Sequence, residues 1–239
     1  MKSNIVLPIA GLGERFVEKG YVLPKPMIDV KGQYLVEKSL ESVNTEDSQL
    51  IFIVRKEHED DFAIKSKLVE KFGKDIKVIE VDYTTPGAIC TCLLAAEYID
   101  NDVPLIIFTP DCYFEPQFDL ERIDITYDGV VCTFESNSDA HSYVVLDENN
   151  FVLKAAEKEV ISSHAVGGLY YFKKGSYFVK YANELVERNV KSRGEYYICP
   201  VYNLLINDGM KIGIDPNSKH IVLGTPKDLE SYIGKIHEQ

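Results

Sequence analysis

Short apolar runs alternate with amphipathic segments along the first half of the chain, and this alternation limits the possible folds most strongly. Residues 5–9, 50–54, 77–81 and 104–109 have the composition of strands, and the run at 50–54 is apolar at every position. Continuous apolar runs are typical of strands buried on both faces of a parallel sheet. The alternation therefore predicts an α/β fold with a doubly wound, mostly parallel sheet and right-handed crossovers.

The segments between these runs predict helices. Residues 34–43 carry apolar side chains at helical spacing, and residues 58–72 place Phe62, Val69 and Phe72 on one face of a surface helix. Residues 87–99 are almost entirely apolar, which predicts a single buried helix. Each of these helices would connect two neighbouring parallel strands.

The second half of the chain has a different sequence pattern, in which short strand-like segments are separated by turn segments rich in Asn, Asp and Ser. The expected strands are 130–135, 143–146, 152–156 and 165–172. A length of 239 residues with 45% hydrophobic residues suits one domain with a sizeable core. We therefore expect a single domain over 1–239, with a first half at 1–115 and a second half of small mixed β-structure at 116–239.

Composition excludes several classes of protein. A formal charge of −12 argues against a non-specific nucleic-acid binder, because such binding depends on neutralising phosphates. The chain has neither an apolar run long enough to cross a bilayer nor a leader-like start, which predicts a cytoplasmic protein without a membrane partner. An odd number of cysteines without a Cys-x-x-Cys pattern predicts reduced thiols and no zinc site.

The loop after the first strand has the parts of a polyphosphate site. Gly11 and Gly13 allow backbone N–H groups to approach a large anion, and Arg15 adds a planar cation. Lys25 lies between two prolines that stiffen its backbone. The loop lacks the third glycine of a dinucleotide fingerprint and the Gly-Lys-Ser/Thr of a Walker loop. A lone Gly-x-Gly is also compatible with an ordinary loop.

Local charge at this loop can outweigh the acidic surface. Distant carboxylates are screened beyond roughly 8 Å in physiological salt. A lysine about 4 Å from a phosphate oxygen contributes on the order of 4 kcal/mol at an effective dielectric near 20. The negative net charge is therefore compatible with a nucleoside triphosphate as ligand.

An aspartate, Asp111, follows the run at 104–109, so it should lie at the carboxyl edge of the sheet beside the first loop. Mg²⁺ takes one or two carboxylates together with phosphate oxygens, which this position could provide. By position alone, the residue could equally be a turn aspartate at the end of a strand.

The pattern Gly-x-Gly-x-Arg followed by Pro-Lys-Pro resembles the signature of the sugar-phosphate nucleotidylyltransferase (NDP-sugar pyrophosphorylase) family. The resemblance covers essentially the full length and is closest to a short bacterial branch from capsule and surface-polysaccharide synthesis. That branch includes CTP:phosphoglutamine cytidylyltransferase-like proteins. The resemblance implies a nucleotide-diphospho-sugar transferase fold, with a nucleotide-binding half at 1–115 and an acceptor-binding half at 116–239.

The resemblance also implies an activity. It predicts transfer of a nucleoside monophosphate from an NTP, with CTP favoured, to a small phosphorylated acceptor such as a sugar 1-phosphate or phosphoglutamine. Pyrophosphate would be released, Mg²⁺ would be the cofactor, and a homodimer is possible. Base, acceptor and oligomeric state are not determined by the sequence.

Site residues follow from the same resemblance, by position in the matching motifs. The expected catalytic residues are Arg15, Lys25 and Asp111, with Asp111 as the metal ligand. The expected nucleotide-binding residues are Ala10, Gly11, Gly13, Thr85, Gly87 and Ala88. The expected acceptor-binding residues are Glu157, Lys158, Gly168 and Glu195. Taken without the resemblance, Glu157 and Lys158 form an ordinary exposed pair. Glu195 could equally cap the helix that follows it, face the acceptor or act as a second acid.

Two departures from the family pattern bear on the site. The proline expected after Lys158 is Glu159, which weakens the case for a standard hexose phosphate as acceptor. Family members carry a second metal-binding aspartate just before the matching Gly-Thr, where residues 220–223 read His-Ile-Val-Leu. The second carboxylate is therefore missing or supplied elsewhere, with Glu195 and Asp215 as open alternatives.

Two other functions fit parts of the pattern. A nucleotide-sugar-dependent glycosyltransferase of similar topology would usually have Asp-x-Asp after the central strand, and the residue two positions after Asp111 is Tyr113. A non-catalytic nucleotide-binding module is compatible with the missing second aspartate.

Overall fold

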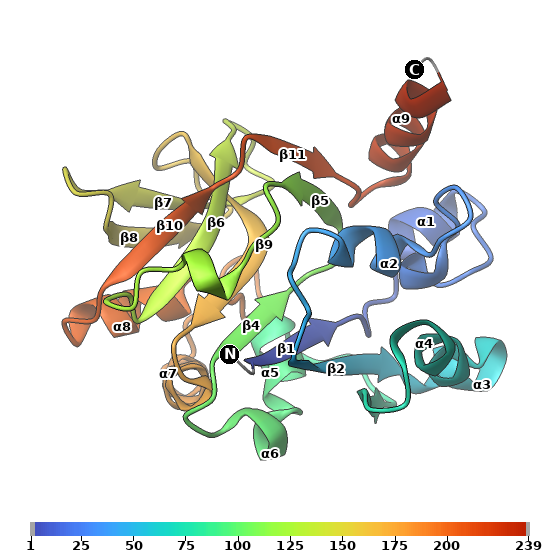
Figure 1. Cartoon of the computed structure of the whole chain (residues 1–239), viewed down its shortest axis with the longest axis horizontal. Helices are drawn as coiled ribbons and strands as arrows, with labels where there is room; N and C mark the ends of the chain where they lie inside the picture. The colour runs from blue at the N-terminus through green and yellow to red at the C-terminus, as the bar shows by residue number, and fades with distance from the viewer. Residues whose placement is uncertain (1–2, 238–239) are drawn as a thin grey trace.

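Among residues 3–237, which the computed structural model describes, a nine-stranded sheet runs through the centre of the protein (Figure 1). Its first half is parallel: β1 (Ser3–Pro8) lies between β2 (Ser48–Arg55) and β4 (Leu105–Phe108), and β3 (Lys77–Val81) pairs with β2. All four expected strands of the first half are present. The mostly parallel, doubly wound α/β fold is confirmed.

The second half extends the same sheet beyond β4. Strand β9 (His164–Phe172) runs antiparallel between β4 and β6 (Gly129–Glu135), and β10 (Ile212–Pro216) pairs in parallel with β6. The hairpin of β7 (Ser142–Leu146) and β8 (Val152–Glu157) attaches to β9. The two halves of the chain therefore share one continuous sheet.

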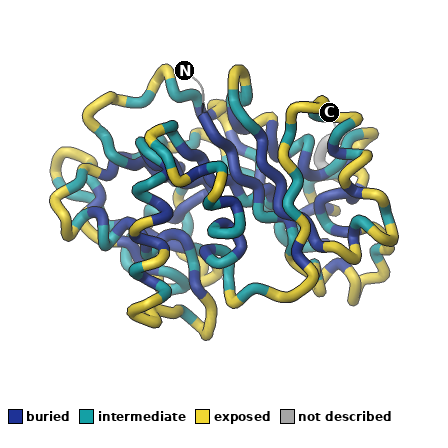
Figure 2. Tube along the Cα trace, turned by 90° about the horizontal axis from the view of Figure 1, so that it is seen from below, coloured by how far each residue is buried: buried dark blue, intermediate teal, exposed yellow. Residues whose placement is uncertain are grey.

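Successive side chains of β1 point to opposite faces of the sheet, and each face is covered by helices. Val6 packs into the cluster covered by α5 (Ala88–Leu93), α6 (Ala96–Ile99), α7 (Gly175–Glu187) and α8 (Val201–Asn207). Ile5 and Leu7 face the cluster covered by α2 (Leu35–Leu40) and α4 (Ile64–Phe72). In Figure 2 the strands form a buried centre beneath more exposed turns.

The expected single helix at 58–72 is wrong. The segment contains α3 (Lys56–Phe62) and α4, separated by Ala63, whose φ of 50° is left-handed and cannot continue an α-helix. The Glu59 side chain accepts a hydrogen bond from the Lys65 N–H at 2.7 Å, which satisfies a donor in the first turn of α4. Ile64 and Leu68 are the fully buried side chains of this segment, rather than the expected aromatic stripe.

The expected helix at 87–99 is also divided, into α5 and α6. The N–H groups of Leu94 and Ala95 bond to the carbonyls of Thr91 and Cys92, an i to i−3 pattern that tightens the chain and ends the first helix. Both parts remain on the buried face, as expected.

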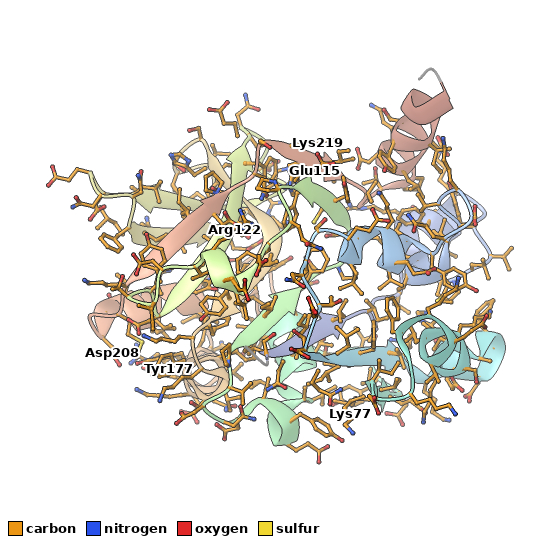
Figure 3. The ribbon with its side chains drawn as sticks, viewed as in Figure 1. Lys77, Glu115, Arg122, Tyr177, Asp208 and Lys219 are labelled. Atoms are coloured by element: carbon orange, nitrogen blue, oxygen red, sulfur yellow. The ribbon has the colours of Figure 1, made fainter. Side chains whose placement is uncertain are left out.

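A small second sheet was not expected from the sequence. Strand β5 (Cys112–Glu115) pairs antiparallel with β11 (Lys219–Val222), more than one hundred residues away. Glu115 and Lys219 form an ion pair at 3.1 Å along this pairing, and both are labelled in Figure 3. The pairing brings residues 222–224 beside Asp111, because the Leu223 N–H donates to the Asp111 carbonyl at 2.7 Å.

The remaining helical segments lie on the side of the first loop. They are α1 (Glu14–Glu18), the 3₁₀ turn η1 (Lys25–Met27) and α9 (Pro226–His237), with a further 3₁₀ turn, η2 (Leu120–Arg122), after β5. Leu223 and Leu229 pack with Phe16 and Leu35 in a third apolar cluster that joins these segments. Among residues 3–237, no helix combines the length and hydrophobicity needed to span a membrane.

Candidate active site

A cavity of about 560 Å³ opens at the carboxyl ends of β1 to β4. Parallel sheets commonly place ligands at this edge, because the strand-to-helix loops converge there. Ten residues expected in the site line this one cavity: Ala10, Gly11, Gly13, Arg15, Lys25, Thr85, Gly87, Ala88, Asp111 and Glu195. These ten residues come from five separate segments of the chain.

The first loop presents unused backbone donors to the cavity. Among the described residues, the N–H groups of Gly11, Leu12 and Gly13 donate no hydrogen bond. Gly13 has a φ of 65° and lies against Lys25, whose Cβ would be 3.4 Å from a Cβ at position 13. Adjacent N–H groups without acceptors form a concave donor surface that suits phosphate oxygens.

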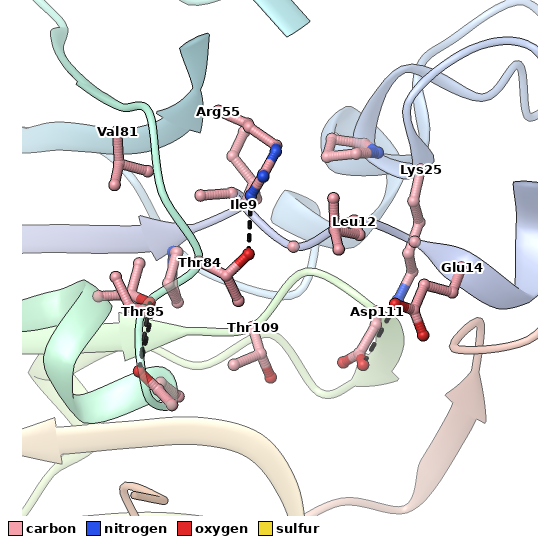
Figure 4. A pocket seen from close by; sticks show the side chains of 18 of the residues that line it. Ile9, Leu12, Glu14, Lys25, Arg55, Val81, Thr84, Thr85, Thr109 and Asp111 are labelled. Atoms are coloured by element: carbon pink, nitrogen blue, oxygen red, sulfur yellow. Dashed lines mark hydrogen bonds and ion pairs between the residues drawn. The ribbon is translucent and has the colours of Figure 1, made fainter. Parts of the chain in front are cut away.

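Lys25 and Asp111 form an ion pair across the mouth of the cavity, with 3.5 Å between Nζ and Oδ2 (Figure 4). Lys25 starts the turn η1, whose first bond runs from the Met27 N–H to the Pro24 carbonyl. The flanking prolines therefore hold the lysine on a stiff turn, as the sequence predicted. The Asp111 side chain is 45% exposed, so its carboxylate is accessible to a ligand.

Asp111 offers an accessible carboxylate that could hold a divalent cation only together with oxygens of a ligand, because no three His, Cys, Asp or Glu side chains of residues 3–237 form a metal site. Carboxylate oxygens together with phosphate oxygens are the ligands that Mg²⁺ prefers. Position 223, close to the family's second aspartate, holds a leucine that is fully buried in an apolar cluster. Glu14 lines the same cavity, and in Figure 4 its side chain points toward the end occupied by Lys25 and Asp111.

The two open alternatives for the second carboxylate lie elsewhere. Asp215 does not line the cavity; it pairs with Arg122 at 3.7 Å, and burial raises the pKa of this carboxyl. Glu195 lines the cavity but is adjacent to Tyr196, whose N–H donates to the Pro86 carbonyl at 3.0 Å. Glu195 is therefore held beside the loop at 83–88 rather than beside Asp111.

The loop at 83–88 is fixed by contacts on both sides. Thr85 and Thr91 share a hydrogen bond of 2.6 Å between their hydroxyls. Gly87 has a φ of 135°, and a Cβ there would lie 2.5 Å from the Tyr196 backbone, so only glycine fits. These contacts hold Thr85 and Ala88 rigidly along the cavity wall.

Glu157, Lys158 and Gly168 do not line this cavity. Glu157 is only 3% exposed at its side chain, accepts a hydrogen bond from Ser142 and lies 3.5 Å from Lys158 Nζ. Burial raises the pKa of Glu157, while Ser142 and Lys158 oppose the shift. The reading of Glu157 as part of an ordinary exposed pair is therefore wrong.

Gly168 contacts a residue that borders the cavity, whereas the contacts of Lys158 lie outside it. The Lys158 ammonium donates to the Ala140 carbonyl and lies 5.6 Å from the centre of the Tyr197 ring. Gly168 accepts hydrogen bonds at its carbonyl from the N–H and hydroxyl of Thr109, a cavity residue. A Cβ at Gly168 would lie 2.6 Å from the Thr109 hydroxyl, which explains the glycine.

Sequence reasoning missed Glu14 and Arg55, which both line the cavity. Glu14 lies inside the motif that identified the first loop, between Gly13 and Arg15. Arg55 is the last residue of β2, at the carboxyl edge of the sheet. Ligands of parallel sheets bind at this edge, so the position of Arg55 after a strand could have indicated a site residue, as that of Asp111 did.

His220 lies close to the site and makes stability depend on pH. It stacks on Phe134 with 3.8 Å between ring centroids, and its Nδ1 is buried without a hydrogen-bond partner among the described residues. Burial, assisted by His141, lowers the pKa of His220 to about 4. An unfolded histidine titrates near 6.5, so between about pH 6.5 and 4 the unfolded chain binds a proton that the native protein does not.

This histidine should therefore stabilise the native state fully above about pH 6.5 and lose that effect as the pH falls toward 4. We expect the unfolding free energy of the native protein to fall between pH 7 and pH 4 by up to about 3 kcal/mol more than that of the His220→Phe variant. Denaturant titrations at several pH values measure the difference. Parallel pH profiles for the two proteins would contradict it.

Known proteins resemble this chain over most of its length. The bifunctional protein GlmU of Methanocaldococcus jannaschii is 28% identical over 235 residues, which cover 95% of this chain and 52% of that protein. GlmU of Clostridioides difficile is 24% identical over 225 residues, covering 89% and 46%. The chain spans about half the length of the curated relatives it matches. No protein-family model matches the chain.

Among solved structures, the nucleoside-diphosphate-sugar pyrophosphorylase of Vibrio cholerae RC9 superposes with a TM-score of 0.82 and 27% identity, covering 96% of this chain and 99% of that one. The chain is therefore similar to sugar-phosphate nucleotidylyltransferases over nearly its whole length. The inositol-1-phosphate CTP transferase of T. maritima has a TM-score of 0.76 at 16% identity, covering 100% and 95% of the two chains. This second likeness shows the fold of the family.

Proposed function

We propose that this protein is a nucleotidyltransferase that transfers a nucleoside monophosphate from an NTP to a small phosphorylated acceptor and releases pyrophosphate. One observation carries the proposal: a single cavity joins the unused N–H groups of residues 11–13 to the Lys25–Asp111 pair. Similarity to a nucleoside-diphosphate-sugar pyrophosphorylase supports the same reaction class. A sugar 1-phosphate is the acceptor class suggested by the names of the relatives, and phosphoglutamine is the alternative from the sequence resemblance.

The proposed reaction is an in-line displacement at the α-phosphorus. An oxygen of the acceptor phosphate forms a bond to the α-phosphorus, and the bond from that phosphorus to the bridging oxygen of the β-phosphate breaks. Pyrophosphate leaves with the electron pair of that bond. The protein supplies position and counter-charge rather than covalent chemistry.

Each group of the cavity has a role in this scheme. The N–H groups of Gly11 and Gly13, together with Arg15, bind the β- and γ-phosphates, while Lys25 neutralises charge that develops at the α-phosphate. Asp111, with Glu14 beside it, would hold Mg²⁺. When bound, that ion would neutralise the charge of the triphosphate.

The acceptor half of the site is a separate part of the proposal. Lys158 would orient the acceptor phosphate and Glu157 a hydroxyl or amide of the acceptor. Both lie outside the cavity, beside Tyr197, so this role requires the acceptor to extend from Asp111 toward that residue. Cytoplasmic location, a homodimer and a role in capsule or surface-polysaccharide synthesis remain predictions from the sequence.

Pyrophosphate release tests the proposal directly. The protein would be incubated with Mg²⁺, each of ATP, GTP, CTP, UTP and dTTP, and a panel of sugar 1-phosphates, phosphocholine and phosphoglutamine. We expect release with one nucleotide and one acceptor class. Transfer of a sugar from a finished nucleotide-sugar would support a glycosyltransferase instead. NTP binding in calorimetry without release on a broad acceptor panel would support a non-catalytic module.

A further inference from the structure

Arg55 is buried at the end of the cavity that lies away from Lys25 and Asp111 (Figure 4). It is the last residue of β2, the strand between β1 and β3, so it lies between the first loop and the loop at 83–88. Its side chain is only 9% exposed. The guanidinium is therefore part of the cavity wall rather than of the protein surface.

The protein uses only part of this guanidinium. Nε donates to Glu57 at 2.9 Å, and Nη1 makes a long contact of 3.4 Å with the Thr84 hydroxyl. No hydrogen bond from Nη2 is present among residues 3–237. Nη2 is also absent from the fully buried atoms without a partner in this part of the chain, so it faces the open cavity and is free to donate to a ligand.

The pair with Glu57 does not explain why Arg55 is buried. The Glu57 side chain is 64% exposed, and an arginine could reach it equally well from the surface, where such pairs contribute little. A buried arginine with unused donors on a cavity indicates that the missing acceptors belong to a ligand.

The position in the cavity identifies which part of a nucleotide would supply them. The unused N–H groups of residues 11–13 and the Lys25–Asp111 pair mark the end for phosphates and metal. Arg55, Val81, Thr84 and Thr85 surround the other end (Figure 4). A nucleotide with its phosphates at the first end would direct its base toward Arg55.

We propose that Arg55 selects the base of the nucleotide by donating to a carbonyl oxygen and an adjacent unprotonated ring nitrogen. The inference rests on the proposed function. Cytosine offers this pair of acceptors at O2 and N3, whereas uracil and thymine carry a proton at N3 that would face the guanidinium. Adenine has no carbonyl oxygen, whereas guanine offers O6 and N7 to a guanidinium, so the contact separates cytosine from uracil and thymine rather than from guanine. Arg55 therefore makes the site prefer CTP over UTP.

The test compares CTP and UTP binding by calorimetry in the native protein, Arg55→Gln and Arg55→Lys. We expect the native protein to bind CTP at least 10-fold more tightly than UTP, since one two-donor contact discriminates between bases by about 10- to 100-fold. Both variants should reduce that ratio to nearly one. Arg55→Lys keeps the charge and the buried stem, so it isolates the loss of the planar fork.

Two controls separate base recognition from charge. Arg188→Gln removes an arginine that pairs with Glu184 on α7, away from the cavity, and should leave both affinities unchanged. Arg15→Gln removes a charge at the phosphate end and should weaken CTP and UTP equally. Thermal unfolding of each variant shows whether the protein tested is folded. If Arg55→Gln does not fold, the comparison of CTP and UTP affinities is made with Arg55→Lys alone.

Native preference for UTP, or an equal loss of CTP and UTP affinity in the Arg55 variants, would overturn the inference. The proposed function is judged separately, by pyrophosphate release from the native protein with any nucleotide. Release with unchanged base preference in the variants removes Arg55 from base selection and leaves the reaction class intact.

Discussion

Asp111→Asn is expected to lower pyrophosphate release by about 10²- to 10³-fold or more, because the reaction would lose the carboxylate that we propose as the metal ligand. The substitution keeps the size of the side chain and removes only its charge. Lys25, 3.5 Å away, would also lose its partner. Steady-state rates of pyrophosphate release at saturating Mg²⁺ measure the effect.

The fold should survive this substitution. The Asp111 side chain is 45% exposed, and an exposed ion pair contributes about 1 kcal/mol or less. Asp215→Asn is the matched control, since Asp215 pairs with Arg122 outside the cavity and should be dispensable for turnover. Full activity of Asp111→Asn would remove this residue from the reaction, and a large loss in Asp215→Asn would move the metal site toward β10.

Gly175→Ala is expected to destabilise the protein by about 3 kcal/mol or more. Gly175 begins α7, and a Cβ at this position would lie 1.9 Å from the Ile99 carbonyl oxygen at the end of α6. The Gly175 N–H also donates to the Val103 carbonyl at 2.9 Å, so α7 cannot move away without losing that bond. The higher helix propensity of alanine, about 1 kcal/mol, does not offset the clash.

Gly234→Ala provides the control for this prediction. Gly234 lies in α9, where a Cβ would have no neighbour within 4 Å, so alanine should leave stability unchanged or raise it slightly. Urea titrations of the two variants and the native protein give the comparison. Equal midpoints for the two variants would show that α6 and α7 separate at little cost.

The sequence by itself determined the parallel half of the sheet and the first loop. Continuous apolar runs predicted β1 to β4 because a strand buried on both faces needs apolar side chains at every position. The same local reasoning predicted that Gly13, Lys25 and Asp111 would meet, since loops at the carboxyl ends of neighbouring parallel strands converge. The motif around these residues also indicated the family.

Only the tertiary structure decided the features that depend on distant contacts. The pairing of β5 with β11 leaves no local periodicity, because each strand is stabilised by a partner far along the chain. The break at Ala63 depends on a left-handed backbone conformation that helical spacing does not reveal. Pairing with β11 places the apolar Leu223, rather than an aspartate, beside Asp111. A different carboxylate, that of Glu14, lines the cavity.

The environments of Glu157 and Arg55 also depend on distant contacts. Nothing near Glu157 in the sequence indicates that its carboxylate is buried against Ser142, a neighbour on the adjoining strand. Arg55 appears in the sequence as one arginine after a strand, and only the packing of β2 between β1 and β3 turns its side chain into the cavity wall. Burial and unused hydrogen-bond donors are properties of the assembled sheet, because they depend on residues that are remote in the chain.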